Sequence, residues 1–431
     1  MTPSRTTTTT LLLAVMAGLG CSSSSPGPAA GTGDGGLPPG VDATTDSHSV
    51  PPEAGDALVH KDAAPPDAGD ALVREDAAPD APISLDAPDD AGHDAGPDAA
   101  SPSGFAALTA CLGASVPLTI SGQMPYVSVA MTAGSGTESG EFVLDYATTF
   151  SSIDLSAFAA PGPTTSGCNA SELGSDCTVG GFVFFGPPSS VVLETEDFSD
   201  VSGTVRQAGI VGTDLTSEHV LTLDYAGGHA YAASPSTACS ASALTAAGFA
   251  SLTTAGFFEN NLALLEPGTD VDSNDAEGES VPNVPTVSVS VACTKALAQL
   301  DTGFDDSVTP FSVNVNQAFY TAIVGANASA LVRAASLDES LSTCVSGVSE
   351  PVKAYTLASG VTFDFVGAGS SVARSYASAV IFVKETPAAA QECGGIGTWT
   401  VPAAQVGASF YVDMGALVFD PFGAEVWIPH T

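Results

Sequence analysis

Short runs of apolar and β-branched residues recur from Val116 onward and are separated by Gly, Ser and Pro. Runs of this kind, bounded by turn residues, are typical of short β-strands. A longer apolar stretch, Ala318–Val332, instead predicts one helix. The pattern therefore predicts an all-β fold with a few short helices, whose sheets hide their edges by closing. The runs are Val116–Ile120, Tyr126–Met131, Glu141–Leu144, Phe182–Phe185, Val191–Leu193 and Val220–Leu223.

Residues 22–103 have a different composition, dominated by Ala, Asp, Pro, Gly and Ser, with almost no aromatic residues. Such a segment buries too little apolar surface to offset the entropy lost on ordering. We therefore predict a disordered stalk here. It contains a fourteen-residue repeat, Glu53–Pro66 and Asp67–Asp80. The repeat lacks the Asp-x-Asp-x-Asp-Gly order of a calcium loop, which favours a self-repelling, extended spacer over a calcium site.

Residues 1–21 predict a lipoprotein signal peptide. The apolar core Leu11–Ala17 is too short to span a bilayer and is followed by Leu19-Gly20-Cys21-Ser22. This order resembles a bacterial lipoprotein cleavage site with Cys21 as the lipidated residue. We expect an exported protein, anchored by lipid in the bacterial cell envelope or at the cell surface. The alternative is ordinary secretion with Cys21 unmodified.

The formal net charge of the 431-residue chain is -39, from 48 acidic and 9 basic side chains. This charge argues against nucleic-acid binding, because few cations are present to neutralise phosphates. It also argues against electrostatic adhesion to anionic lipid, so we expect membrane contact only through the anchor. An acidic protein is compatible with an extracytoplasmic location and with work at low pH. The acidic segment Asp270–Ser280 predicts an exposed connector.

Two aspartates each stand at the end of an apolar run and before a turn. Asp301 follows Ala296–Leu300, and Asp145 follows Phe142–Leu144. Each aspartate is followed later in the chain by an apolar element that ends in Gly and then by a strand pair, at 209–228 and 406–423. This repeated order indicates that the two halves arose by duplication. Two carboxyl groups brought close together cannot both ionise and share one proton. Such a pair supplies both the base and the acid that hydrolysis by water needs.

The sequence Asp301-Thr302-Gly303 resembles the catalytic loop of pepsin-like and retropepsin-like aspartic proteases. The resemblance extends over Leu118–Ile428 and implies a bilobal pair of double-psi β-barrels, in lobes at 104–240 and 241–431. It also implies a monomeric endopeptidase that acts on a peptide or protein substrate without a cofactor. In such an enzyme Asp145 and Asp301 would share the attacking water.

The resemblance further implies that Thr302 locks the two loops together and that Gly303 permits close backbone approach. The first loop departs from this pattern, because Tyr146 and Ala147 replace Thr and Gly. Tyr146 is too large for the same buried position, and the methyl group of Ala147 is costly wherever φ is positive. The stretch Phe182–Gly186 has no flap tyrosine. These departures support an alternative hypothesis, a catalytically inactive surface lipoprotein of the same fold that binds or scaffolds.

Other chemistries have weaker support in the sequence. Asp305 and Asp306 have no neighbouring histidine and are interpreted as solvated or turn carboxylates, so no metal site is predicted. A lone aspartate such as Asp145 can also cap its own turn. No Gly-x-Ser-x-Gly elbow indicates a serine hydrolase. A carbohydrate-binding β-sandwich is disfavoured by the 7% aromatic content.

The cysteines predict disulfides in an oxidising compartment. Cys168 and Cys177 are close in sequence and predict a short closed loop. The family resemblance implies a second bridge, between Cys344 and Cys393. For Cys239 two partners remain open, Cys111 and Cys293.

Overall fold

A computed structural model describes residues 104–168, 173–199, 201, 203–255, 284–343, 345, 347–393 and 395–430. The predicted signal peptide with Cys21, the stalk, the connector at Asp270–Ser280 and Cys344 lie outside these residues. All described residues belong to one unit of the chain, His93–Thr431.

Eight strands of the first half form one sheet, in the order β2-β3-β4-β9-β5-β8-β7-β6. The strands are β2 (Thr119–Ser121), β3 (Met124–Ala133), β4 (Gly136–Leu144), β5 (Ser152–Ile153), β6 (Thr165–Ser166), β7 (Asp176–Phe182), β8 (Ser189–Thr195) and β9 (Gln207–Val211).

A sixteen-stranded sheet combines strands of both halves, mainly in the order β1-β11-β10-β23-β24-β12-β13-β14-β22-β15-β21-β18-β16. Off this path, β17 pairs with β18, and β19 pairs with β13 and β20. The strands are β1 (Ala114–Pro117), β10 (Val220–Asp224), β11 (His229–Ala233), β12 (Phe249–Ala255), β13 (Thr286–Val291), β14 (Thr294–Leu300), β15 (Ser312–Val315), β16 (Leu331–Arg333), β17 (Glu339–Ser342), β18 (Ser349–Leu357), β19 (Phe363–Val366), β20 (Val372–Tyr376), β21 (Val380–Lys384), β22 (Ala403–Val406), β23 (Ala416–Asp420) and β24 (Glu425–Pro429).

The helices are short, which confirms the predicted all-β class. They are α1 (Thr213–Thr216), α2 (Ala241–Ala246), α3 (Gln317–Ala326) and α4 (Ser409–Met414), together with several single 3₁₀ turns. None of the described helices is long and apolar enough to cross a bilayer. The prediction of closed sheets is not met in the described residues, where both strand orders are open.

Both halves repeat one strand connectivity. In the first half β4 runs parallel to β9, while β5 pairs antiparallel with β9 and parallel with β8. In the second half β14, β22, β15 and β21 repeat these three pairings in the same senses. The duplication inferred from sequence is therefore visible in the backbone, and it places the two aspartates at equivalent strand ends.

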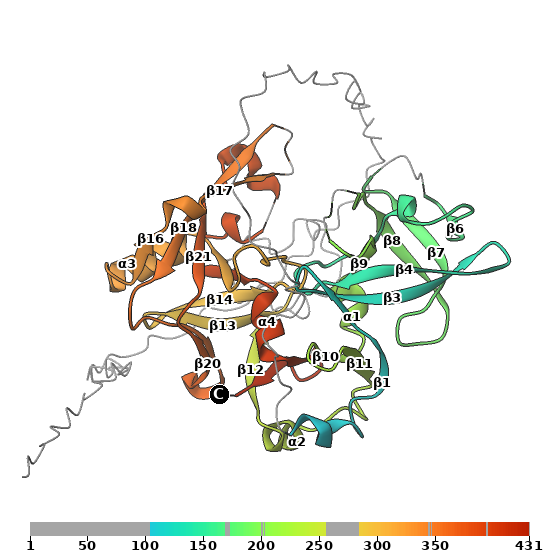
Figure 1. The fold of residues 1–431 in the computed structure, drawn as a ribbon, viewed down its shortest axis with the longest axis horizontal. Coiled ribbons are helices and arrows are strands. Elements are labelled where there is room, and N and C mark those ends of the chain that lie inside the picture. The colour runs from blue at the N-terminus through green and yellow to red at the C-terminus, as the bar shows by residue number, and fades with distance from the viewer. Residues whose placement is uncertain are drawn as a thin grey trace, which may run out of the picture. The chain divides into compact units, whose positions relative to one another are not determined.

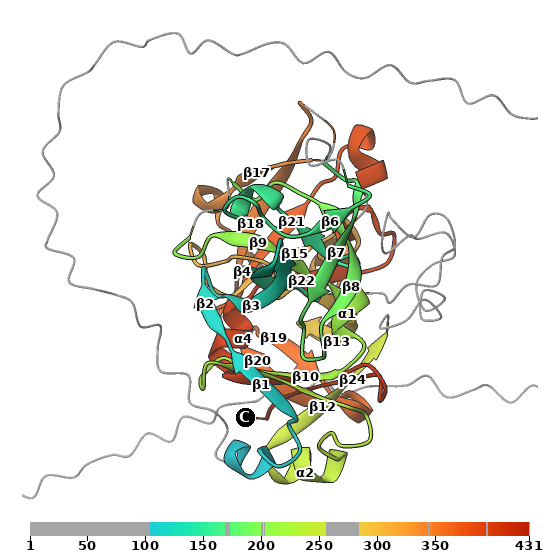
Figure 2. The same ribbon diagram turned by 90° about the vertical axis from the view of Figure 1, so that its right-hand side faces the viewer.

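The halves are joined by main-chain pairing as well as by side chains. β10 of the first half pairs antiparallel with β23 of the second half, so that Leu223 lies opposite Leu417. Figure 1 shows β3 and β4 on one side, β13 and β14 on the other, and β10 to β12 below them. The turned view of Figure 2 shows β10, β24 and β12 in this lower region, where β24 pairs with β12 and β23 lies between β10 and β24 in the strand order. The main apolar core includes buried residues from both halves, such as Phe142, Leu221 and Phe419.

Three predicted elements differ from the structure. The run Phe182–Phe185 is not a strand, because β7 ends at Phe182, Val183 makes only an isolated bridge to Ala130, and Phe185 has a positive φ of 53°. The run Val116–Ile120 is divided between β1 and β2, since Leu118 leaves the ladder and its N–H bonds the carbonyl of Gly228. The predicted helix over Ala318–Val332 ends earlier, at Ala326. Asn327 is in an extended conformation and its side chain accepts hydrogen bonds from the N–H and hydroxyl of Ser329. Such Asx turns compete with helix continuation, and Leu331–Arg333 becomes β16.

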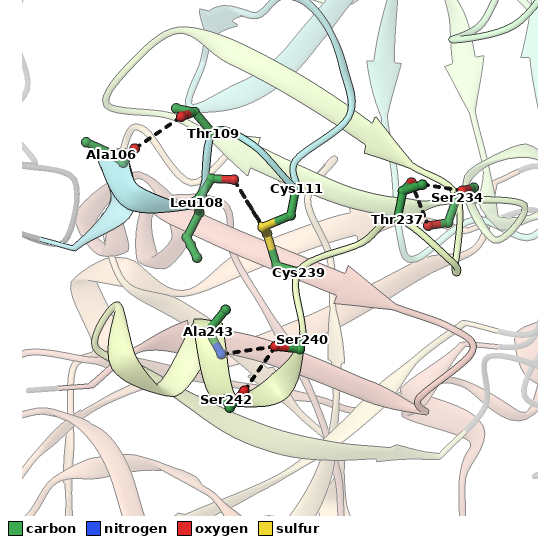
Figure 3. The surroundings of a disulfide bond; sticks show 10 residues. All are labelled: Ala106, Leu108, Thr109, Cys111, Ser234, Thr237, Cys239, Ser240, Ser242 and Ala243. Atoms are coloured by element: carbon green, nitrogen blue, oxygen red, sulfur yellow. Dashed lines mark hydrogen bonds between the residues drawn. A yellow bond between two sulfur atoms is a disulfide. The ribbon is translucent and has the colours of Figure 1, made fainter.

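Two disulfides are present in the described residues. Cys168 bonds Cys177, as predicted. Cys111 bonds Cys239, which decides between the two partners considered for Cys239 and ties the segment before β1 to the segment before α2 (Figure 3). The predicted bridge from Cys393 to Cys344 is not tested, because Cys344 is not described. Disulfides are typical of proteins that mature in an oxidising compartment.

Candidate active site

Asp145 and Asp301 directly follow equivalent strands. The parallel pairing of β4 with β9 continues past Leu144, because the Asp145 N–H donates to the carbonyl of Val211 at 3.0 Å. In the second half Leu300, the last residue of β14, pairs with Val406 of β22. Both aspartates are therefore held at the end of a strand in the interior of a sheet, and each is only 8% exposed.

Each carboxylate accepts a hydrogen bond from its own turn. The N–H of Ala147 donates to Asp145 Oδ1 at 2.7 Å, and the N–H of Gly303 donates to Asp301 Oδ1 at 2.9 Å. Ala147 does not have a positive φ. The extra methyl group expected to be costly at this position is therefore accommodated without left-handed backbone, and the first turn keeps the same hydrogen bond as the second.

The second oxygen of each carboxylate has a side-chain donor, and the two donors differ. The hydroxyl of Thr148 donates to Asp145 Oδ2 at 2.9 Å, whereas the amide of Gln405 donates to Asp301 Oδ2 at 2.7 Å. Asn314 orients Gln405, since its amide donates to Gln405 Oε1 at 3.1 Å. Gln405 is a site residue that the sequence pattern did not predict. Its signal is a polar residue before Val406-Gly407, where the first half has Ile210 before Val211-Gly212.

The two carboxyl groups meet. Asp145 and Asp301 hydrogen-bond each other, although they are 156 positions apart in the chain. Burial raises the pKa of Asp145, an effect opposed by its hydrogen bonds. Burial and then the charge of Asp145 raise the pKa of Asp301 well above its usual range. Two close carboxyl groups in a desolvated site hold one proton between them over a range of pH.

Thr302 and Gly303 support this contact from the second loop. The Thr302 hydroxyl donates to the carbonyl of Leu144 at 2.6 Å and accepts from the N–H of Tyr146 at 3.0 Å. It therefore bonds the backbone on both sides of Asp145. A Cβ atom on Gly303 would lie 2.5 Å from Asp145 Oδ2. Glycine is needed here because any side chain would occupy the space of the partner carboxylate.

Tyr146 makes this lock one-sided. Thr at this position would provide a hydroxyl for the opposite loop, but the Tyr146 ring instead stacks on Phe419, with centroids 3.6 Å apart and planes 8° from parallel. The residue is 1% exposed, and burial raises the pKa of its hydroxyl. Tyr146, expected to be too large for this buried position, is accommodated because its ring packs in the main apolar core against Phe419 of β23.

A second pair of polar clamps holds the segments that follow the aspartates. In the first half Asp214 of α1 accepts from the N–H and hydroxyl of Ser151. In the second half the partners are exchanged, and Asp306 of the loop accepts from the N–H and hydroxyl of Ser409 at the start of α4 and from the N–H of Ser312. Asp306 is 4% exposed, so the interpretation as a solvated carboxylate is wrong for it.

Asp305, by contrast, is exposed and accepts from the N–H of Ser307 at 2.9 Å, as expected of a turn carboxylate. It lines a cavity of about 380 Å³ together with Asp145 and Gly303. This volume lies in the range of small-molecule and side-chain pockets. The remaining lining residues are mostly apolar: Met124, Val143, Phe198, Val201, Gln207 and Ile210.

Phe184 and Phe185, from the stretch compared with a flap, do not line this cavity. Both rings contact the ring of His219 at centroid distances of 6.5 Å. In the described residues no group of His, Cys, Asp and Glu side chains has the arrangement of a metal site.

No protein-family model and no curated protein matches the chain. Similar solved structures include basic 7S globulin from soybean, at 8% identity and a TM-score of 0.39, the protein named edgp, at 11% and 0.38, and conglutin gamma, a basic 7S globulin from lupine seeds, at 8% and 0.38. Each alignment covers 74% of this chain and 94% of the other. Similarity at this level gives no information on activity.

Proposed function

We propose that this protein is an aspartic endopeptidase-like hydrolase related to the pepsin-like proteases. The observation that supports this most strongly is the direct contact of Asp145 and Asp301, each on a turn that donates one backbone N–H to its carboxylate. Structural carboxylates are normally paired with cations or spaced apart, because burying two of them together is unfavourable. A buried acid pair beside a cavity is therefore a strong candidate for acid–base chemistry.

The pair supplies the proton transfers that peptide hydrolysis needs. The ionised carboxylate takes a proton from water as the water oxygen bonds the carbonyl carbon. The protonated carboxyl gives its proton to the carbonyl oxygen, which forms a neutral tetrahedral diol. The C–N bond then breaks as the amine receives a proton and the diol is deprotonated, so the pair returns to its single-proton state.

Activity at acidic pH tests this proposal. The purified protein is incubated with a denatured, unstructured protein from pH 3 to pH 7, and new amino termini are counted. Cleavage is expected below about pH 6, where the pair retains its shared proton. Absence of new termini across this range contradicts the proposal.

A peptide-binding protein without the reaction is the second candidate. The observation in its favour is Tyr146, whose ring stacks on Phe419. The threonine hydroxyl that joins the loops at Thr302 therefore has no counterpart at the equivalent position of the first loop. Peptide binding that persists at all pH values without cleavage supports this candidate over the first.

The lock through Thr302 gives a prediction on stability. Thr302→Val keeps the shape of the side chain but leaves the Leu144 carbonyl and the Tyr146 N–H buried without their partner. We expect a loss of about 2–4 kcal/mol in the free energy of unfolding, measured by denaturant titration. Thr254→Val is the matched control, because the buried Thr254 hydroxyl has no hydrogen-bond partner among the described residues. Equal losses in the free energy of unfolding for Thr302→Val and Thr254→Val contradict the role of Thr302 in joining the two loops.

Gln405 gives a prediction on pH dependence. Its amide donates to Asp301 and stabilises the ionised form, so Gln405→Leu should raise the pKa of the carboxyl pair. The pH–activity profile should shift upward by roughly one unit, as expected for a charged hydrogen bond of about 1.5 kcal/mol. Asn314→Ala, which releases Gln405 without removing it, should produce a smaller shift in the same direction. An unchanged profile in Gln405→Leu contradicts this role.

We also propose that the chain is an exported, monomeric lipoprotein attached through Cys21, with its substrates peptides or proteins rather than nucleic acids. The two disulfides support export. Metabolic labelling with a fatty acid, lost in Cys21→Ser, tests the anchor.

A further inference from the structure

The cavity beside Asp145 combines apolar walls with one acidic side chain from the other half of the chain. Met124 and Val143, on β3 and β4, are buried walls, and Ile210 of β9 adds a third apolar side chain. Asp305 comes from the loop that follows Asp301. The cavity thus lies between the two halves, and it is bounded by a proposed catalytic carboxylate at one point and by Asp305 at another.

Three observations place the Asp305 carboxylate at the first half of the chain. It lines the cavity. A Cβ atom on Gly122, in the turn between β2 and β3, would lie 2.5 Å from Asp305 Oδ2, so the absence of a side chain at Gly122 makes room for the carboxylate. The charge of Asp305 also contributes, after burial, to raising the pKa of Tyr126 to about 12. Tyr126 bonds Gln207 of the cavity wall at 3.1 Å.

Asp305 is not neutralised by a basic side chain in the described part of the protein. Six Lys and Arg residues lie there, and five of them form ion pairs with other carboxylates. The sixth, Lys295, donates to the hydroxyl of Ser370. A carboxylate at an apolar cavity therefore keeps its charge available for a ligand.

We propose that this cavity binds a lysine or arginine side chain of the peptide substrate and that Asp305 determines this preference. The long methylene stem of either residue packs on the apolar walls while its cationic end reaches the carboxylate. An aliphatic side chain of equal length fills the walls but leaves Asp305 without a partner, and an acidic side chain is repelled. The formal charge of -39 also attracts cationic peptides to the protein.

This inference rests on the proposed function for the identity of the ligand as a peptide, but its test does not depend on cleavage. Fluorescence anisotropy measures the binding of three peptides that differ only at one central residue: lysine, norleucine or glutamate. The full-length chain carrying Asp301→Asn serves as the receptor, so that hydrolysis does not deplete the peptide. We expect the lysine peptide to bind about ten-fold more tightly than the norleucine peptide, and the glutamate peptide to bind most weakly.

Asp305→Asn, added to the same receptor, should remove the difference between lysine and norleucine while leaving norleucine binding within two-fold. Asparagine retains the acceptor for the Ser307 N–H. Glu218→Gln is the matched control, because Glu218 is also exposed but does not line the cavity. The lysine preference should also weaken as salt is raised from 0.05 to 0.5 M, a test that needs no further variant.

Equal binding of the lysine and norleucine peptides, a preference that survives Asp305→Asn, or no binding of any peptide each overturns the inference. A lysine preference that depends on Asp305 supports it even if the wild-type protein cleaves nothing, which would refute the proposed hydrolase and retain the specificity site. If the wild-type protein cleaves peptides but binds lysine and norleucine peptides equally, the proposed hydrolase is supported and the specificity site is refuted.

Discussion

Asn in place of Asp301 should abolish peptide cleavage at every pH. The substitution preserves the shape of the side chain and its acceptor for the Gly303 N–H. It removes the carboxyl group that shares a proton with Asp145, and an amide neither accepts a proton from water nor returns one. General acid–base catalysis contributes about 10²–10⁴-fold, and loss of half the pair removes the acid and the base roles together, so we expect a decrease of at least about 1,000-fold in kcat/KM.

Asp145→Asn should have an effect of the same size, since the two residues act as one unit. Asp420→Asn is the matched control, because Asp420 also accepts backbone N–H bonds in a turn but lies at the far end of β23. It should retain full activity. Substantial activity in either dyad variant, with the control unaffected, means that cleavage has another origin.

The protein should be more stable in mild acid than at neutral pH. Burial raises the pKa of four aspartates above the ordinary 3.8: the dyad residues Asp145 and Asp301, and the clamp residues Asp214 and Asp306. Each group binds its proton more tightly in the folded chain than in the unfolded chain. Its contribution is therefore fully present below about pH 3.8 and is lost as pH rises through the folded-state pKa.

We expect the melting temperature at pH 4 to exceed that at pH 7 by more than about 5 °C, given that 1 kcal/mol corresponds to about 2–4 °C in domains of 150–250 residues. Asp301→Asn should raise the melting temperature at pH 7 and change it little at pH 4, because the charge repulsion within the dyad is already absent in acid. The expectation that these aspartates are buried in protonated form is contradicted if the protein is most stable at neutral pH and Asp301→Asn does not raise its melting temperature.

Much of the candidate site was predictable because its members are local in sequence. An apolar run that ends in Asp and a turn specifies a buried strand followed by a change of chain direction, and this pattern occurs twice. Thr302 and Gly303 follow Asp301 directly, so their contribution could be inferred with it. The short strands were predictable for a similar reason, since their apolar runs are bounded by turn residues.

Other features depend on residues that are distant in sequence. Gln405 bonds Asp301 across the parallel pairing of β14 with β22, 104 positions later. The sequence pattern gives Asp305 and Asp306 the same interpretation, as solvated or turn carboxylates, but Asp305 is exposed and Asp306 is buried against Ser409. Adjacent residues can point to opposite environments, and only the packing of the chain distinguishes them.

The amino-acid sequence by itself determined that two similar halves each present an aspartate after an apolar strand, and that the cysteines nearest in sequence bond each other. Only the tertiary structure decided that the two carboxylates touch, that the Tyr146 ring packs on Phe419 instead of opening the loops, and that Asp305 reaches the first half at Gly122. The physical reason is range: hydrophobic periodicity and turn propensity act over a few residues, whereas the contacts of a site depend on distant strands, such as β10 and β23, pairing across the two halves.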